Sequence, residues 1–147
     1  MFTNILVPTD GTENSRNALE RAVTVADAFD ATVHLLSVAP SRGGEQKQDQ
    51  LRSDPDDAAD EAIRDASERL DREGIDYVTS VPEGEPEEEI LAYADANPID
   101  LIVMGTHGRT GLDRVLLGSV AEKTVRNAHV PVMTVPPADE QSSLQNR

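Results

Sequence analysis

The sequence predicts one α/β domain: a doubly wound, open parallel sheet of five strands with helices on both faces. Short apolar runs alternate with longer segments of helical periodicity, which is typical of a covered parallel sheet. The chain has 147 residues, enough to bury one sizeable core. Two of the apolar runs end in glycine-containing turns, and ligands of such sheets bind beyond the carboxyl ends of the strands.

The expected strands are short and rich in apolar or β-branched residues. They cover residues 5–7, 31–38, 75–81, 99–104 and 130–135. The third alternates, which favours a place near an edge. The last contains Pro131, which has no N–H for a central ladder, so this strand is also expected at an edge. His34, within the second run, is expected to be a packed or edge histidine rather than a ligand.

The expected helices cover residues 13–29, 56–73, 86–97 and 119–127. Their apolar residues recur at three- and four-residue intervals and predict the buried faces. These residues are Ala18, Leu19, Ala22, Val23, Ala26 and Phe29 in the first helix, Ala59, Ala62, Ile63, Ala66 and Leu70 in the second, and Val120, Ala121, Thr124 and Val125 in the last. Pro86 suits the first position of its helix, and the three glutamates after it favour the positive end of the dipole.

The composition is acidic, with 28 acidic against 13 basic residues and a net charge of −15. It disfavours nucleic acids and anionic membranes as partners, because their binding depends on basic clusters. No apolar stretch approaches the ~20 residues of a membrane span, and the first residues lack a basic signal-peptide region, so we expect a cytoplasmic protein. The acidic surface fits either an ordinary acidic protein or adaptation to high salt.

The charge is unevenly distributed along the chain. Residues 1–103 carry 24 acidic and 8 basic residues, whereas residues 104–130 carry two acidic and four basic ones. The four basic residues are Arg109, Arg114, Lys123 and Arg126. This positive segment suits a polyanionic ligand, although chance clustering would give the same pattern.

The positive segment contains the most informative motif, M-G-T-H-G-R-T-G-L-D-R-V-L-L-G-S-V at residues 104–120. Its glycines allow sharp turns or close approach of a ligand. We expect Ser119 at the N-cap of the following helix, with Glu122 completing a capping box. Strand, glycine turn and helix N-terminus would together direct free N–H groups at one place, which suits a phosphate.

The spacing of this motif is G-x2-G-x9-G-S, from Gly105 and Gly108 to Gly118 and Ser119. It is neither a Walker loop nor the G-x-G-x-x-G dinucleotide fingerprint. It resembles the nucleotide-binding signature of the ATP-binding branch of the universal stress protein family. The resemblance covers nearly the whole chain as one domain, residues 1–147, and is weakest at residues 41–55, which we expect to form a mobile loop; residues 136–147 are expected to be a flexible tail.

The resemblance implies the strand order 3-2-1-4-5, a homodimer formed through residues 130–135, and ATP with Mg²⁺ as ligand. Adenine would lie near Val38 and Asp10, and ribose near Gly105. The implied nucleotide-binding residues are Pro8, Thr9, Asp10, Val38, Gly84, Met104, Gly105, Thr106, His107, Gly108, Arg109, Gly118, Ser119 and Val120. Asp10 suits turn formation as well as ribose, base or indirect Mg²⁺ contact, and Gly84 suits a simple turn as well as close approach of a ligand.

The function that this resemblance implies is a dimeric, ATP-dependent stress or signalling module with unidentified protein partners and at most slow hydrolysis. Alternatives are a nucleotide hydrolase or nucleotidyl-transferring enzyme using the same pocket, or a dimeric scaffold without nucleotide. His107 is a candidate general acid or base, but the sequence positions no second group to orient it. Arg109 is either a partner of the terminal phosphates or a solvated arginine.

Overall fold

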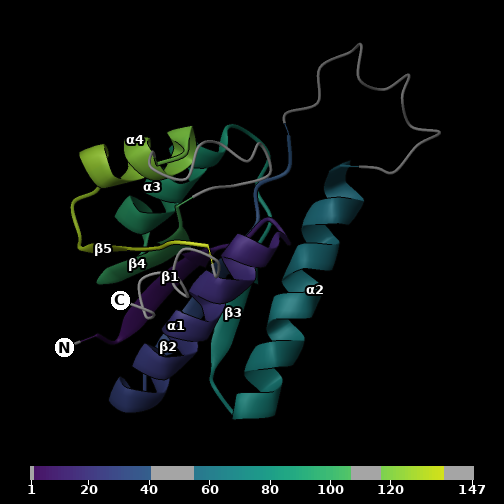
Figure 1. Cartoon of the computed structure of the whole chain (residues 1–147), viewed down its shortest axis with the longest axis vertical. Coiled ribbons are helices and arrows are strands. Elements are labelled where there is room, and N and C mark those ends of the chain that lie inside the picture. The colour runs from purple at the N-terminus through teal and green to yellow at the C-terminus, as the bar shows by residue number, and fades with distance from the viewer. Residues whose placement is uncertain (1, 41–54, 107–116, 138–147) are drawn as a thin grey trace, which may run out of the picture.

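The computed structural model describes residues 2–40, 55–106 and 117–137. Strands and helices alternate strictly along the described chain (Figure 1). In order they are β1 (Asn4–Pro8), α1 (Glu13–Phe29), β2 (Thr32–Leu36), α2 (Pro55–Glu73), β3 (Tyr77–Ser80), α3 (Pro86–Ala96), β4 (Leu101–Gly105), α4 (Ser119–Asn127) and β5 (Val132–Val135). The predicted elements are all present, and their ends differ by a few residues. Nearly all of the expected mobile loop and most of the expected tail lie outside the described residues.

The five strands form one parallel sheet in the order β3-β2-β1-β4-β5. The predicted fold class and strand order are therefore confirmed. Winding reverses between β1 and β4, where Ile5 pairs with Leu101 and Leu6 with Ile102. Such a reversal leaves a crevice at the carboxyl ends of the two strands, because their connections leave to opposite faces of the sheet.

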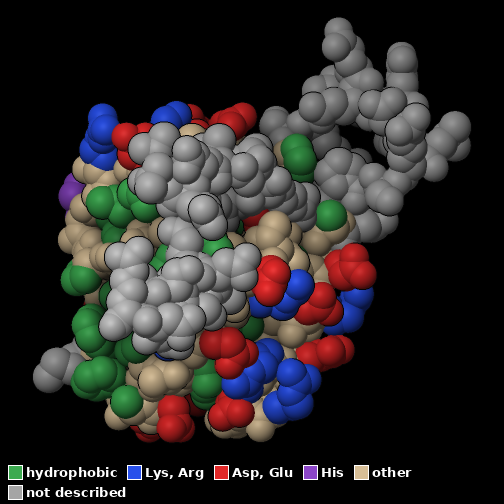
Figure 2. All heavy atoms as spheres, in the orientation of Figure 1, with side chains coloured by type: hydrophobic (Ala, Val, Ile, Leu, Met, Phe, Trp, Pro, Cys, Tyr) green, Lys and Arg blue, Asp and Glu red, His purple; other side chains and the backbone are tan. Residues whose placement is uncertain are grey.

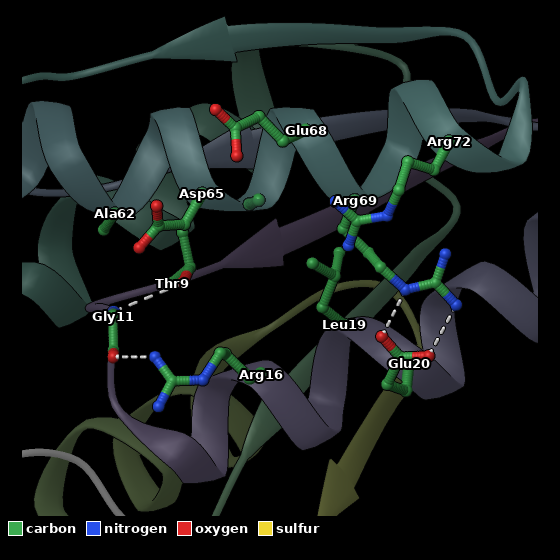
Figure 3. A pocket seen from close by; sticks show the side chains of 11 residues that line it. Thr9, Gly11, Arg16, Leu19, Glu20, Ala62, Asp65, Glu68, Arg69 and Arg72 are labelled. Carbon is green, nitrogen blue, oxygen red and sulfur yellow. Dashed lines mark hydrogen bonds and ion pairs between the residues drawn. The ribbon is translucent and has the colours of Figure 1, made fainter.

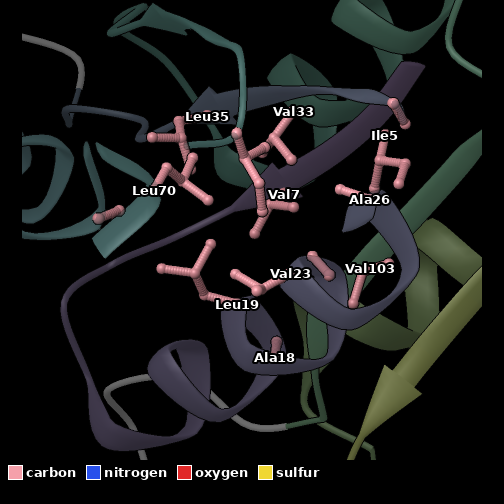
Figure 4. Close-up of a cluster of buried hydrophobic side chains, with 14 of the residues drawn as sticks. Ile5, Val7, Ala18, Leu19, Val23, Ala26, Val33, Leu35, Leu70 and Val103 are labelled. Atoms are coloured by element: carbon pink, nitrogen blue, oxygen red, sulfur yellow. The ribbon is translucent and has the colours of Figure 1, made fainter. Parts of the chain in front are cut away.

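Two apolar clusters cover the two faces of the sheet. On one face α1 and α2 pack over the first cluster, in which Ile5, Val7 and Val33 of the strands meet Leu19 of α1 and Leu70 of α2 (Figure 4). On the other face α3 and α4 pack over a second cluster, to which Leu6, Ile102 and Met104 contribute from the strands and Ile90 and Ala121 from the helices. Successive strand residues thus alternate between the clusters, as the side-chain period of a strand requires.

His34 connects the second face of the sheet to α3. The residue is 9% exposed, and both ring nitrogens have partners: Nδ1 lies 2.7 Å from the Tyr93 hydroxyl and Nε2 lies 3.0 Å from Oδ1 of Asn4. Burial lowers the pKa of this imidazole. The prediction of a packed histidine is confirmed.

Three predicted features differ from the structure. Phe29 is 43% exposed and meets Phe2 edge-on, because α1 ends there at the rim of the sheet. Val125 is 46% exposed, since the short α4 buries mainly Ala121 and Thr124. Pro55, expected in a loop, is the first residue of α2, a position that suits the fixed φ of proline.

The described surface over α1 and α2 carries acidic and basic side chains side by side (Figure 2). Arg69 of α2 bonds both carboxylate oxygens of Glu20 on α1, at 2.6 and 2.8 Å, and Arg126 pairs with Glu122 along α4. No helix among the described residues is long and apolar enough to cross a membrane.

Candidate functional site

The candidate site lies where the carboxyl ends of β1 and β4 meet the N-terminus of α4. Two backbone hydrogen bonds hold this arrangement. The Gly118 N–H donates to the Thr106 carbonyl at 2.7 Å, and the Thr106 N–H donates to the Val135 carbonyl at 3.1 Å. The chain that leaves β4 at Gly105 therefore returns to the same place to start α4, which brings together both ends of the glycine motif.

The N-terminus of α4 differs from the predicted capping box. Gly118 is the N-cap and Ser119 is the first helical residue, so the cap residue has no side chain with which to make a capping hydrogen bond. The Glu122 N–H donates to the Gly118 carbonyl at 2.9 Å, while the Glu122 carboxylate pairs with Arg126. The predicted N-cap role of Ser119 is therefore wrong: glycine adopts the extended cap conformation here, and the Ser119 hydroxyl has no capping bond to make.

This geometry leaves amide groups at the start of α4 without partners inside the helix. The first four N–H groups of any α-helix lack intrahelical acceptors, and here they belong to Gly118, Ser119, Val120 and Ala121. The first of them is bonded to Thr106. The other three lie at the positive end of the helix dipole, where an anion is stabilised.

Asp10 forms the turn that leads from β1 into α1. Its Oδ1 accepts hydrogen bonds from the Thr12 N–H at 3.0 Å and the Thr12 hydroxyl at 2.6 Å. Thr12 in turn caps α1 by accepting from the Ser15 N–H. The turn role considered for Asp10 is thus present, at the carboxyl end of β1 beside the end of β4. Capping itself falls to Thr12.

Val38 and Gly84 lie together beyond the ends of β2 and β3. Ala39, next to Val38, accepts from the Gly84 N–H at 2.9 Å and donates to the Pro82 carbonyl at 2.8 Å. Gly84 has φ +147°, which an L side chain rarely adopts, and Glu89 packs closely against it. The backbone conformation accounts for glycine at this position, because the Glu89 carboxylate could move away from a side chain there.

The other predicted site residues fall into three groups. Pro8 and Thr9 lie at the end of β1, where the Thr9 N–H donates to the Leu36 carbonyl at 2.8 Å. Met104 is 4% exposed and belongs to the second apolar cluster, and Val120 packs against the same cluster. His107, Gly108 and Arg109 lie outside the described residues, as does Arg114 of the positive segment.

Two basic residues of the predicted positive segment, Lys123 and Arg126, lie among the described residues, and their ion pairs reduce the positive charge that they offer to a ligand. Lys123 lies 3.5 Å from a Glu87 carboxylate oxygen, and Arg126 lies 2.8 Å from one of Glu122. Both basic side chains are thus already paired with carboxylates. Among the described side chains, no three His, Cys, Asp or Glu residues gather as metal ligands.

Asn14 is a site residue that sequence reasoning missed. It lies in the first turn of α1, yet its side-chain amide donates to the Val135 carbonyl at 3.0 Å and its Oδ1 and Cγ lie against Gly105. An asparagine in the polar first turn of a helix carries no sequence signal of such a contact. Only the packing of α1 across β4 and β5 brings these residues together.

A cavity between α1 and α2 was also absent from the sequence predictions (Figure 3). Its volume is about 410 Å³, and its lining mixes arginines with carboxylates above an apolar floor. Arg16 donates to the Gly11 carbonyl at 2.7 Å, and Arg69 binds Glu20 and Glu73. The hydrogen bonds from Arg69 lower the pKa of Glu20. The Arg69–Glu20 pair joins the two helices, and among the residues that line the cavity Thr9 and Gly11 lie next to the candidate site.

Known proteins are similar to this chain in sequence and in fold. The chain is 36% identical over 143 residues to Universal stress protein MJ0531 of Methanocaldococcus jannaschii, covering 92% of this chain and 82% of that protein. The solved structure of MJ0577 from the same organism matches with a TM-score of 0.80 and 30% identity, over 92% of this chain and 96% of that one.

A universal stress protein solved in complex with cAMP matches with a TM-score of 0.74 and 25% identity, over 92% of this chain and 98% of that chain. The sequence profile described as "Universal stress protein family" matches residues 1–136. This match spans every described strand and helix. The chain therefore belongs to the universal stress protein family.

Proposed function

We propose that this protein is a nucleotide-binding stress or signalling module that holds ATP at the carboxyl ends of β1 and β4. The observation that carries the proposal is the return of the chain from Gly105 to α4, closed by the 2.7 Å bond from Gly118 to Thr106. This return brings the N-terminal amides of α4 beside the end of the sheet, at the reversal of winding where ligands of this fold class bind. The related protein in complex with cAMP supports an adenine nucleotide as the ligand.

In the proposed complex the phosphates lie against the N–H groups of Ser119 and Val120. These amides have no acceptor within α4 and lie at its positive end, so they suit a phosphate without a large cluster of lysines. The Ser119 hydroxyl makes no capping bond and would donate to a phosphate oxygen. Gly108 and Arg109 are proposed to complete this cradle on the resemblance alone.

In the proposed complex the adenine base lies near Val38 and Asp10. Gly84 lies next to Val38 on the side of β3. The hydrogen bonds that join Ala39 to Pro82 and Gly84 hold this segment against the turn after β3. Backbone groups at Val38 would then meet the edge of the adenine ring, and Gly105 would lie close to the ribose. Asp10 already anchors its own turn through Oδ1, which keeps its carboxylate at the end of β1.

Mg²⁺ would enter with the triphosphate. The ion usually keeps several waters and is held by one or two carboxylates together with phosphate oxygens. Asp10 is the carboxylate at the end of β1 that would reach it, directly or through water. The ion would neutralise part of the charge on the phosphates, and the protein would contribute their orientation.

We further propose that two copies pair through the edge of β5 and that any hydrolysis is slow. β5 is an edge strand of the sheet, and Met133 on it is 37% exposed, so both its backbone edge and an apolar side chain are available to a second copy. Slow turnover is proposed because the sequence has neither the catalytic aspartate motif nor the arginine-plus-glutamine machinery of fast phosphoryl transfer.

The test is calorimetric titration of the purified protein with ATP, ADP, AMP and cAMP, each with and without Mg²⁺, preceded by mass spectrometry of any nucleotide released on heating. We expect ATP to bind, and Gly118→Leu to abolish that binding while the protein stays folded. Ser119→Ala should weaken ATP binding about three- to tenfold through loss of one hydrogen bond to phosphate.

Thr24→Ala is the matched control, because this exposed hydroxyl on α1 bonds the carbonyl of Glu20 in the preceding turn of its own helix. It should leave ATP affinity unchanged. If wild-type protein binds none of the four nucleotides, or if Gly118→Leu binds ATP as well as wild type does, the proposed site is refuted.

A further inference from the structure

Asn14 joins three elements at the base of the candidate site. Its Nδ2 donates to the Val135 carbonyl at 3.0 Å, across 121 residues of sequence. The same carbonyl accepts the Thr106 N–H at 3.1 Å. The last residue of β5 is therefore held at once by α1 and by the residue that follows β4.

The same side chain occupies the space in front of Gly105. A Cβ added to Gly105 would lie 2.8 Å from both Cγ and Oδ1 of Asn14, closer than real Cβ contacts come. Gly105 is not among the described residues with positive φ, so its backbone conformation does not by itself demand glycine. Asn14 therefore takes the room that a side chain at residue 105 would need.

A short series of contacts then leads from Asn14 to the phosphate cradle. Asn14 and Thr106 share the Val135 carbonyl as acceptor, and the Thr106 carbonyl accepts the Gly118 N–H at 2.7 Å. Gly118 is the N-cap of α4, whose next amides are those proposed to meet phosphate. Asn14 is thus connected through three hydrogen bonds to the N-cap residue of α4.

We propose that Asn14 is a positioning residue of the nucleotide site: it sets Gly105 and Thr106 against β5 so that the α4 amides converge on the phosphates. This inference rests on the proposed function, and it adds a residue of α1 that the glycine motif does not contain. Asn14 acts through the backbone of its neighbours and not by contact with the nucleotide. A glycine at residue 105 leaves the space that the Asn14 side chain occupies.

The first test compares Asn14→Ala with Asn17→Ala in calorimetric titrations with ATP and Mg²⁺. Asn17 lies one turn further along the same helix, and its buried Nδ2 has no hydrogen-bond partner among the described residues, so its loss breaks no such bond. We expect Asn14→Ala to weaken ATP binding about five- to tenfold and Asn17→Ala to leave it within about twofold of wild type. Melting without nucleotide, measured for all three proteins, separates affinity from stability.

The second test is a double-mutant cycle with Gly105→Ala. In the wild-type background the new methyl group meets Asn14, and we expect ATP affinity to fall more than about tenfold. In the Asn14→Ala background the space is open, so the same methyl group should change affinity less than about twofold. This strong non-additivity is what two residues in direct contact produce.

The outcomes separate the two proposals. Wild-type protein that binds no adenine nucleotide would refute the proposed function. Wild-type protein that binds ATP with Asn14→Ala unchanged would overturn the positioning role alone. An additive cycle, in which Gly105→Ala costs as much in the Asn14→Ala background as in the wild type, would show that the ligand and not Asn14 requires the glycine, and would overturn that part of the inference.

Discussion

The buried histidine of β2 should make folding stability depend on pH. In its neutral form His34 donates from Nε2 to Oδ1 of Asn4 and accepts at Nδ1 from the Tyr93 hydroxyl, so every polar group of the ring is used. His34 is 9% exposed, and burial lowers the pKa of its imidazole below the ordinary 6.5. Protonation would place a charge at this buried position and remove the acceptor that Tyr93 uses.

The sign follows from the direction of this shift. Below pH ~6.5 the unfolded chain binds the proton at His34 more readily than the folded protein does. The stabilisation is therefore complete above the unfolded pKa and is lost as the pH falls toward and through the lowered folded pKa. One proton sets an upper limit on the slope, about 1.4 kcal/mol of unfolding free energy for each pH unit.

The assay is urea denaturation between pH ~7.5 and ~5.0 for wild type, His34→Gln and the matched control His129→Gln. His129 is an exposed histidine beyond the end of α4, 3.4 Å from Asp95. We expect His34→Gln to be less stable than wild type at the upper pH but to lose less stability on acidification. The control should follow the wild-type slope. Parallel pH profiles for wild type and His34→Gln would refute the account of a buried neutral imidazole.

Three further predictions concern the surface. Met133 is an exposed residue of β5, so Met133→Glu should convert the proposed dimer to monomers in light scattering, because it puts like charges at the shared edge. Dimers that persist would place the interface elsewhere. Arg69→Met should lower the free energy of unfolding by about 1 kcal/mol, because it removes the ion pairs with Glu20 and Glu73. The control Arg64→Met, at an exposed residue of α2, should not lower it. Equal effects of the two substitutions would argue against a link between α1 and α2 through Arg69. With a net charge of −15, the melting temperature should rise from about 0.1 M to about 2 M KCl if the surface is adapted to high salt, and a flat profile would exclude that idea.

Local sequence was sufficient for the elements and for the two chain segments that meet at the candidate site. The apolar runs and helical periodicities identify each strand and helix, because hydrophobic spacing follows directly from the geometry of each element. The family resemblance supplied the strand order, which alternation alone leaves open. The glycine motif identified both Gly105 and the start of α4, since chain reversal and a helix N-terminus leave traces in neighbouring residues.

Tertiary structure decided which atoms carry those roles. Gly118 rather than Ser119 caps α4, because the hydrogen bond from the Gly118 N–H to the Thr106 carbonyl starts the helix at Ser119. The Ser119 side chain therefore has no capping role. Asn14 reaches the site only through a bond that spans 121 residues. A single sequence records the local preferences of each segment; contacts between distant segments depend on how the helices pack across the sheet, and they leave no periodic trace in the chain.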